Sequence, residues 1–331
     1  MQENLLEIAK QVILDYDIKP SVVELFQYGS IKTVWKLYDS SGLYCLKRMR
    51  YDIEKCLFSV NAQKYMLEKG ANLPDIVDNI HGSSCTKYKG QTFVLYKWLA
   101  GRQLKFEKKR DLKLLVKGLA RFHLASAGYT AGSEILISSK LGRWPHQYSS
   151  MRDRLIRWKE TARGKSRNKL GRIYLEQADF FISLADKALE LLEKSGYSQW
   201  VNELQLRKTL CHQDYGESNT LWTGKQLVVL DLDGVAYDLP VRDLRKLIFK
   251  VMLLRKGWHE DTWRKILTWY EAENPFTEEQ RRILLIDLLF PHEFHNTAKN
   301  PFHKGKESSA NKLALVSSWE QQKAAFLKKL L

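Results

Sequence analysis

Residues 211–219 read CHQDYGESN, and residues 227–234 read LVVLDLDG. The first segment holds a His-x-Asp motif, with Asn219 five residues after Asp214. The second is an apolar run that ends in two alternating aspartates, Asp231 and Asp233. Aspartate and asparagine are common in loops, where they cap helices and form Asx turns, so the short motif alone is weak. The order of the elements around it therefore decides the interpretation.

The first hundred residues predict one small antiparallel sheet. Residues 2–16 have the apolar spacing of an amphipathic helix, and residues 54–69 predict a second helix that ends at Gly70. Segments rich in β-branched and aromatic residues, separated by turn residues, occur at 22–28, 33–38, 43–49, 81–86 and 92–96. We interpret residues 1–97 as an N-terminal lobe.

The rest of the chain predicts helices, with one strand-loop-strand unit at residues 209–235. Helical periodicity is present at residues 111–126, 148–160, 174–194, 243–256, 263–272, 278–289 and 313–330. Residues 164–169 and 296–309 are typical of loops. The expected fold class is α+β, with two lobes as in protein kinases: a small sheet with one helix, a hinge at 98–101, and a larger helical lobe at 102–331.

In this setting, residues 211–234 have the spacing of a phosphotransferase catalytic loop and metal-binding strand. Phosphoryl transfer needs a carboxylate that orients the attacking hydroxyl and accepts its proton, which makes Asp214 the candidate base. We predict His212, beside it in the motif, as the second catalytic residue. Asn219, Asp231 and Asp233 are candidate Mg²⁺ ligands. An extended segment would direct both strand aspartates to the same face.

The N-terminal lobe supplies the candidate contacts to ATP. Lys47 lies on the third predicted strand, where such enzymes have the lysine that contacts the α- and β-phosphates. A tight turn at Gly29 and Ser30 is the candidate phosphate loop, although it has one glycine rather than the G-x-G-x-x-G pattern. We expect the hinge residues Trp98 and Leu99 to contact the nucleotide.

The predicted helix at residues 54–69 lacks the expected glutamate partner for Lys47. Its only glutamates, Glu54 and Glu68, lie near its ends, and Gln63 lies in its middle. Three alternatives remain: a terminal glutamate reaches the lysine, an amide substitutes, or the lysine is unpaired and activity is impaired.

The net charge of the 331-residue chain is +16, and residues 101–172 contribute 19 Lys/Arg against 5 Asp/Glu. If these helices build part of the acceptor site, a polycation would be repelled, and a neutral or anionic small molecule or saccharide would be preferred. The alternative is an ordinary solvated surface. We expect no nucleic-acid partner, because no finger, RNP-type motif or helix-turn-helix is present.

The location and redox state also follow from composition. No apolar run is long enough to predict a membrane span, and the N-terminus lacks a signal-peptide pattern, so cytoplasmic synthesis is expected. The four cysteines have neither zinc-site spacing nor a disulfide pattern and are expected to be reduced and mostly buried. The HEFH segment at residues 292–295 does not have the spacing of a metalloprotease helix, so a structural role is expected.

Several short motifs resemble one family over nearly the full length. They are Tyr44-x-Leu46-Lys47-Arg48, Trp98-x-x-Gly101, Leu119-Ala120-x-x-His123, Gly142-Arg143-Trp144-Pro145, Cys211-His212-x-Asp214, Asp231-Leu232-Asp233, Asp243-Leu244 and Leu289-Phe290-Pro291. The chain resembles the CotS-type spore coat proteins, and among them the spore coat protein I-like branch, within the aminoglycoside phosphotransferase and choline kinase-like superfamily.

This resemblance implies ATP and Mg²⁺ as cofactors, Asp214 as the base, and Asp243 as the residue that supports the catalytic loop. It also implies synthesis in the mother cell, a location in the spore coat, and other spore coat proteins as partners. Two hypotheses therefore compete: a kinase of a small hydroxyl-bearing molecule or saccharide, and a coat assembly protein that keeps the fold but transfers nothing.

Overall fold

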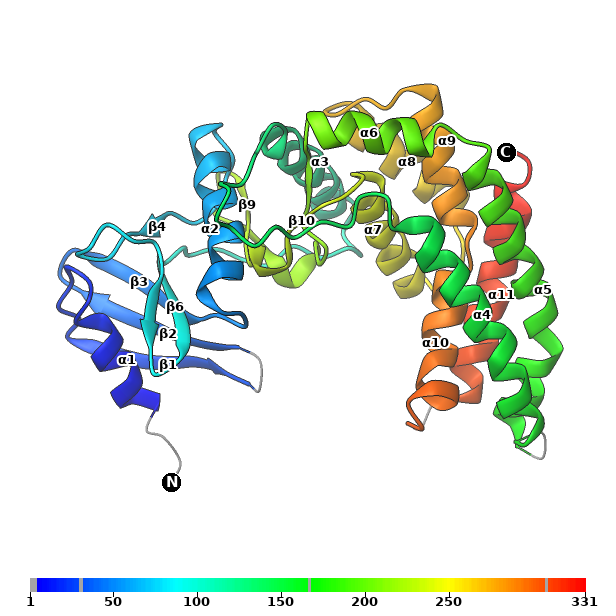
Figure 1. Cartoon of the computed structure of the whole chain (residues 1–331), viewed down its shortest axis with the longest axis horizontal. Coiled ribbons are helices and arrows are strands. Elements are labelled where there is room, and N and C mark those ends of the chain that lie inside the picture. The colour runs from blue at the N-terminus through cyan, green and yellow to red at the C-terminus, as the bar shows by residue number, and fades with distance from the viewer. Residues whose placement is uncertain (1–4, 30–31, 166–167, 307–308) are drawn as a thin grey trace. The chain divides into compact units, whose positions relative to one another are not determined.

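The computed structural model describes residues 5–29, 32–165, 168–306 and 309–331 (Figure 1). The chain divides into two compact units, and each is formed by two separate segments: Met1–Ser139 with Lys208–Tyr237, and Lys140–Arg207 with Asp238–Leu331. The predicted α+β class is confirmed. The predicted hinge at 98–101 lies within the first unit, so the division into lobes at 1–97 and 102–331 stays a prediction.

The first unit contains an antiparallel sheet in the order β1-β2-β3-β6-β4, with β5 also paired to β6. Two small antiparallel pairs, β7 with β10 and β8 with β9, lie outside this sheet. The elements are α1 (Leu5–Ile13), β1 (Val22–Tyr28), β2 (Thr33–Asp39), β3 (Gly42–Arg48), α2 (Ile53–Glu68), β4 (Ile76–Val77), β5 (Thr86–Tyr88), β6 (Gln91–Lys97), α3 (Lys109–Ser126), β7 (Leu210–Cys211), β8 (Thr220–Trp222), β9 (Leu227–Val229) and β10 (Ala236–Tyr237).

Successive side chains on a strand point to opposite faces of the sheet, and in the central strands both faces are covered, whereas the edge strand β1 is largely exposed. On one face, Phe93 and Leu95 of β6 pack with the apolar side of α1. On the other face, Val94 packs with Cys56 and Val60 of α2. The two helices therefore cover the centre of the sheet, where Leu46 and Lys47 of β3 are buried although the start of that strand is exposed.

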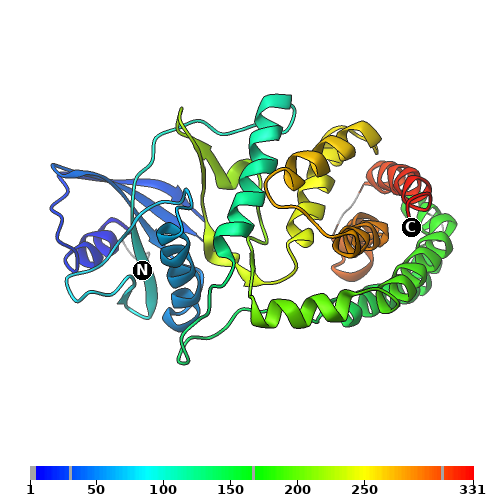
Figure 2. The same ribbon diagram turned by 90° about the horizontal axis from the view of Figure 1, so that it is seen from above.

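The second unit is helical. Its elements are α4 (Trp144–Arg163), α5 (Lys169–Glu193), α6 (Tyr197–Leu206), α7 (Val241–Leu254), α8 (Glu260–Glu271), α9 (Glu278–Leu289), α10 (His292–His303) and α11 (Ala310–Leu327). The helices α4, α5, α10 and α11 lie side by side (Figures 1 and 2). Stacked rings join α5 to α10, with the centroids of Phe181 and Phe294 4.0 Å apart.

The structure corrects several predicted boundaries. Helix α10 (His292–His303) covers part of the segment 296–309 that we predicted as a loop, and α6 was not predicted. Asn300 and Pro301 give α10 a weak helix propensity, but Phe294, Ala298 and Phe302 repeat at four-residue spacing and are buried. Tertiary packing therefore overrides local preference there.

Two further differences are local. The strand predicted at 81–86 is the shorter β5, three residues long, which begins at Thr86. In the predicted loop 164–169, residues 166 and 167 lie outside the described part of the chain, and Asn168 caps α5 by accepting a hydrogen bond from the N–H of Gly171. Among the described helices, none combines the length and apolar character needed to cross a bilayer.

Candidate active site

Lys47 is the centre of a charged cluster in the first unit. It lies on β3, is only 5% exposed, and donates from Nζ to Oδ1 of Asp231 at 2.7 Å and to Oδ1 of Asp233 at 2.5 Å. Burial alone would lower the pKa of Lys47, but Asp233 and Asp231 outweigh burial and raise the pKa above its usual value. The ammonium group is therefore charged.

The backbone turns sharply at Asp231. This residue has a left-handed conformation, with φ of 64°, and precedes the short 3-10 helix η2 (Leu232–Gly234). The prediction of an extended segment through Asp231 and Asp233 is therefore wrong, because β9 ends at Val229. The turn still brings both carboxylates to the ammonium group of Lys47.

A second lysine binds the same carboxylate. Lys32, at the start of the described chain after the predicted phosphate loop, donates to Oδ2 of Asp231 at 2.9 Å. Burial alone would raise the pKa of Asp231, but Lys47 and Lys32 together lower it below the usual range. Asp231 is thus ionised, with one ammonium group on each oxygen. The sequence analysis did not identify Lys32. The feature that could have identified it is a basic residue just after a predicted phosphate loop that has a single glycine.

The buried ring of His212 holds the backbone of the candidate catalytic loop in place. It is completely buried, its Nδ1 accepts a hydrogen bond from the N–H of Asp214 at 3.3 Å, and its Nε2 lies 2.9 Å from the carbonyl oxygen of Leu230. Because Nδ1 accepts, the proton of the neutral ring is on Nε2, which donates to Leu230. These two bonds connect the loop to the residue just before Asp231.

Asp214 is exposed and is oriented by Asn219. The Nδ2 group of Asn219 donates to the backbone carbonyl of Asp214 at 2.9 Å and to its Oδ2 at 3.3 Å. The hydroxyl of Tyr215 donates to the carbonyl of Leu115 on α3 at 2.8 Å and anchors the loop to that helix. The loop therefore holds a solvent-accessible carboxylate on a buried support.

The donor set fits a hard divalent cation. Asp231 and Asp233 offer carboxylate oxygens, and Asn219 has Oδ1 available because its Nδ2 makes the bonds to Asp214. Carboxylate and amide oxygens are the ligands that Mg²⁺ and Ca²⁺ prefer. In the structure these carboxylates already pair with positive charge: Asp231 with the ammonium groups of Lys32 and Lys47, and Asp233 with that of Lys47.

A cavity of about 320 Å³ in the first unit joins these groups to the predicted hinge. Its lining includes Lys32, Lys47, Asn219 and Asp231 together with Trp98 and Leu99 and apolar side chains such as Val34, Tyr96, Leu221 and Leu230. Trp98 packs edge-to-face on Phe26, with ring centroids 4.9 Å apart. Gly29 follows β1 but does not line the cavity, and Ser30 lies outside the described residues.

In the described residues Lys47 pairs with neither a glutamate nor an amide of α2, and it is not unpaired, while impaired activity stays a prediction. Glu54 and Glu68 are exposed, and neither forms an ion pair with Lys47 in the described part of the chain. Gln63 is buried and lines the cavity, but it donates to the carbonyl of Pro74 at 2.7 Å. Asp233 provides the second carboxylate for the lysine instead.

The remaining candidates lie in the second unit or are buried. Asp243 is buried in the first turn of α7, and its support of the catalytic loop stays a prediction. His292, in the HEFH segment for which a structural role is expected, is buried, and its Nε2 lies 2.9 Å from Oδ1 of Asp287. Burial lowers the pKa of His292 to about 3. The four cysteines are free, and all but Cys45 are buried, as predicted.

Comparison with known proteins identifies the family. The profile of the family described as "Spore coat putative kinase YutH" matches residues 11–330. The chain belongs to this family. Spore coat protein S of Bacillus subtilis (strain 168) is 28% identical over 334 residues, which cover 99% of this chain and 95% of that protein. The predicted resemblance to spore coat proteins of this type is confirmed.

Solved structures with low sequence identity show the fold. An aminoglycoside phosphotransferase from Alicyclobacillus acidocaldarius subsp. acidocaldarius DSM 446 has a TM-score of 0.80 at 17% identity, covering 100% of this spore coat family member and 97% of that chain. A microcompartment-associated aminopropanol kinase has a TM-score of 0.64 at 15% identity, covering 98% and 96%. The amicoumacin kinase hAmiN, in complex with AMP-PNP, Ca²⁺ and Ami, has a TM-score of 0.63 at 14% identity, covering 99% and 98%. The predicted kinase-like fold is confirmed.

Proposed function

We propose that this spore coat family member is an ATP- and Mg²⁺-dependent phosphotransferase that acts on a hydroxyl group of a small molecule or saccharide. The observation that carries the proposal is the meeting of Lys47, Asp231 and Asp233 beside the Asp214–Asn219 pair. Phosphoryl transfer requires a phosphate-binding cation, oxygen ligands for a metal ion and a carboxylate base, and this cluster offers a candidate residue for each role, which supports the proposal.

In this proposal the cavity binds the nucleotide. Trp98 and Leu99 contact the base, while Lys47 and Lys32 pair with phosphate oxygens. Asp231, Asp233 and Asn219 hold Mg²⁺, which neutralises the charge of the phosphates when it is bound. The related amicoumacin kinase binds AMP-PNP and Ca²⁺, which supports a nucleotide with a divalent cation in this fold.

Asp214 is the proposed base. The acceptor hydroxyl oxygen forms a bond to the γ-phosphorus of ATP, the bond from that phosphorus to the bridging oxygen of ADP breaks, and the hydroxyl proton moves to the Asp214 carboxylate. Asp214 is exposed and so is accessible to an acceptor. We assign His212, predicted as catalytic, to positioning, because both of its ring nitrogens bond to the backbone of the loop and of Leu230.

The acceptor, the location and the coat partners extend this proposal. The excess of 14 positive charges at residues 101–172 favours a neutral or anionic acceptor over a polycation. The relative named spore coat protein S supports a location in the spore coat after cytoplasmic synthesis, with other coat proteins as partners. Faster turnover of kanamycin than of neutral or anionic sugars would contradict the acceptor preference while leaving the kinase assignment intact.

The proposal is tested by nucleotide binding and turnover in the purified protein. Millimolar MgATP should raise the melting temperature, because a ligand that binds only the folded state stabilises it by about 2.7 kcal/mol at a hundred times its Kd. Asp231→Ala should lose most of the shift, whereas the control Asp17→Ala, at an exposed carboxylate, should keep it.

Two different failures are distinguishable. An unchanged melt with MgATP would overturn nucleotide binding altogether. A clear melting shift without turnover on any sugar or polyol would instead favour the second candidate, a coat assembly protein that keeps the nucleotide site. The single-glycine loop at Gly29 and the absence of an α2 glutamate at Lys47 are the features of the described chain that support this second candidate.

A further inference from the structure

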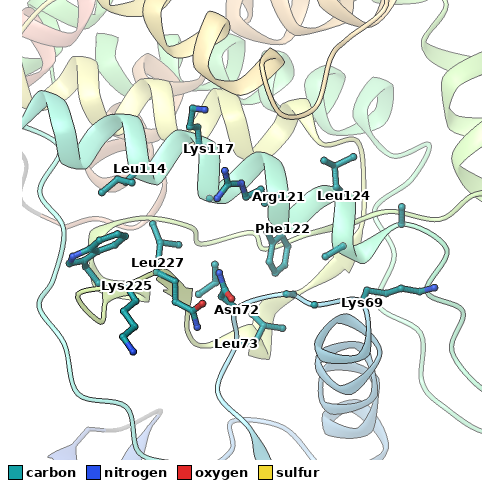
Figure 3. Close-up of a pocket in the computed structure, with 18 of the residues that line it drawn as sticks. Lys69, Asn72, Leu73, Leu114, Lys117, Arg121, Phe122, Leu124, Lys225 and Leu227 are labelled. Carbon is teal, nitrogen blue, oxygen red and sulfur yellow. The ribbon is translucent and has the colours of Figure 1, made fainter.

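A second cavity in the first unit has a volume of about 650 Å³ and shares no lining residue with the nucleotide cavity. It is bounded by the end of α2 and the segment that follows it, by α3, and by the β8–β9 hairpin (Figure 3). Its volume is within the range of small-molecule sites. The proposed phosphotransfer does not use it.

The charge of this cavity has one sign. Four basic side chains line it, Lys69, Lys117, Arg121 and Lys225, and no aspartate or glutamate is among its described lining residues. They come from three parts of the chain: Lys69 from the end of α2, Lys117 and Arg121 from α3, and Lys225 from the β8–β9 turn. In Figure 3, Lys117 and Arg121 lie along α3, and the side chains of Lys69, Lys117 and Lys225 extend outward from the middle of the pocket. A cavity lined by charges of one sign favours an anionic ligand.

The floor of the cavity is apolar and closely packed. Leu73, Phe122 and Leu227 are buried there. Gly118 lets α3 approach the hairpin, because a Cβ at that position would meet Leu227 Cδ2 and the Tyr215 hydroxyl at 2.8 Å each. The N–H of Val229 also donates to the carbonyl of Asn72 at 3.0 Å, which fixes the segment after α2 against β9. The cavity is thus a formed structure with an apolar base.

We propose that this cavity binds a small anion in which a phosphate or carboxylate group is attached to an apolar body. The basic rim would pair with the anionic group, and the apolar floor would cover the hydrophobic part. The proposal also explains part of the charge excess at residues 101–172, because Lys117 and Arg121 belong to that segment. It assigns these two residues to a ligand site separate from the acceptor.

Matched probes test the chemistry of the site. We would titrate the full-length protein with 1-naphthyl phosphate, inorganic phosphate and 1-naphthol, with Mg²⁺ and saturating AMP-PNP present to occupy the nucleotide cavity. The expected result is that 1-naphthyl phosphate binds at least tenfold more tightly than either probe that lacks one of its two parts. Equal binding of 1-naphthol would overturn the anionic site, and no binding of 1-naphthyl phosphate would overturn the proposal entirely.

Variants locate the binding. Arg121→Gln combined with Lys225→Gln should weaken 1-naphthyl phosphate binding at least tenfold and leave the AMP-PNP affinity unchanged. Lys113→Gln is the matched control, because Lys113 is exposed on α3 but does not line the cavity. An unchanged affinity in the double variant, with an unchanged melting temperature, would overturn the assignment to this cavity. Because AMP-PNP affinity is measured separately, a failure of the kinase proposal remains distinguishable.

Discussion

The side-chain amide of Asn219 holds Asp214 at two points, its backbone carbonyl and its carboxylate. Its Oδ1 is the oxygen that the proposal assigns to the metal ion. The proposed base and the proposed metal site are therefore joined by a single side chain, which sets the distance from one to the other. Substitution at Asp214 can separate the two roles, because it leaves Asn219 and the aspartates at 231 and 233 intact.

Asp214→Asn should abolish phosphotransfer while MgATP still raises the melting temperature as in the parent. An amide cannot accept the proton of the acceptor hydroxyl, and a positioned base contributes about 10²–10⁴-fold to the rate. The measurement is turnover under saturating ATP, with the melting shift as the control for nucleotide binding. Equal turnover in the variant and the parent would show that Asp214 is not the base.

Lys32→Gln should raise the KM for MgATP about 10-fold or more, with a smaller effect on kcat. Lys32 binds Oδ2 of Asp231 in the structure, and in the proposal it moves to a phosphate oxygen, a charge-assisted hydrogen bond of about 1.5–3 kcal/mol. Lys87→Gln, at an exposed lysine of β5, is the control and should have no effect. A KM equal to that of the parent would exclude a phosphate-binding role for Lys32.

The second unit should lose stability as the pH falls from about 6.5 to about 4. Burial lowers the pKa of His292 to about 3 and of His295 to about 4, whereas an unfolded histidine has a pKa of about 6.5. In this window the unfolded state binds more protons than the folded state, so the free energy of unfolding rises with pH, by about 1.4 kcal/mol per pH unit for each histidine.

Urea denaturation at pH 5 and pH 7.5 measures this difference. His295→Phe should make the pH dependence shallower, since one of the two buried groups is removed. The control is His81→Gln, at an exposed histidine of the first unit, which should leave the dependence unchanged. Equal pH dependence of the free energy of unfolding in His295→Phe and the parent would contradict the lowered pKa of His295 as a source of this dependence.

Lys323→Met should destabilise the protein by about 3–5 kcal/mol. Lys323 and Glu320 form an ion pair on α11 in which both side chains are fully buried, and Glu320 also accepts a hydrogen bond from the N–H of Glu293 at 3.0 Å. The single variant leaves a buried carboxylate without its cation. The double variant Glu320→Gln with Lys323→Met should lose less than the single one, as judged by urea denaturation. A single variant as stable as the parent would contradict this reading.

Local patterns were enough to predict elements that are stabilised by their own sequence. Helix α9 spans Glu278–Leu289 as predicted, and its start has a capping box between Thr277 and Gln280. Helix α10 was missed because Asn300 and Pro301 oppose helix formation, while burial of side chains such as Phe294, Ala298 and Phe302 stabilises the helix. Patterns that depend on one segment are visible in a sequence, and those that depend on a distant partner are not.

The same distinction applies to the site. The spacing of His212, Asp214, Asn219 and Asp231 could be recognised in the sequence because these residues lie in one short stretch of the chain. The pairing of Lys47 with Asp233, and of Lys32 with Asp231, joins residues almost two hundred positions apart. The left-handed backbone at Asp231 also has no sequence signal, since a non-glycine residue adopts it only when its surroundings require it. The place of Lys47 on the third predicted strand suggested the lysine, and only the structure identified its partners.

The first unit is assembled from two stretches of chain, with Lys140–Arg207 made between them. During synthesis on the ribosome, β3 emerges long before Asp231 and Asp233. The ion pairs of Lys47 with Asp231 and Asp233 therefore cannot form until the chain has been extended past Asp233. The proposed nucleotide site is accordingly completed late, after most of the chain has been translated.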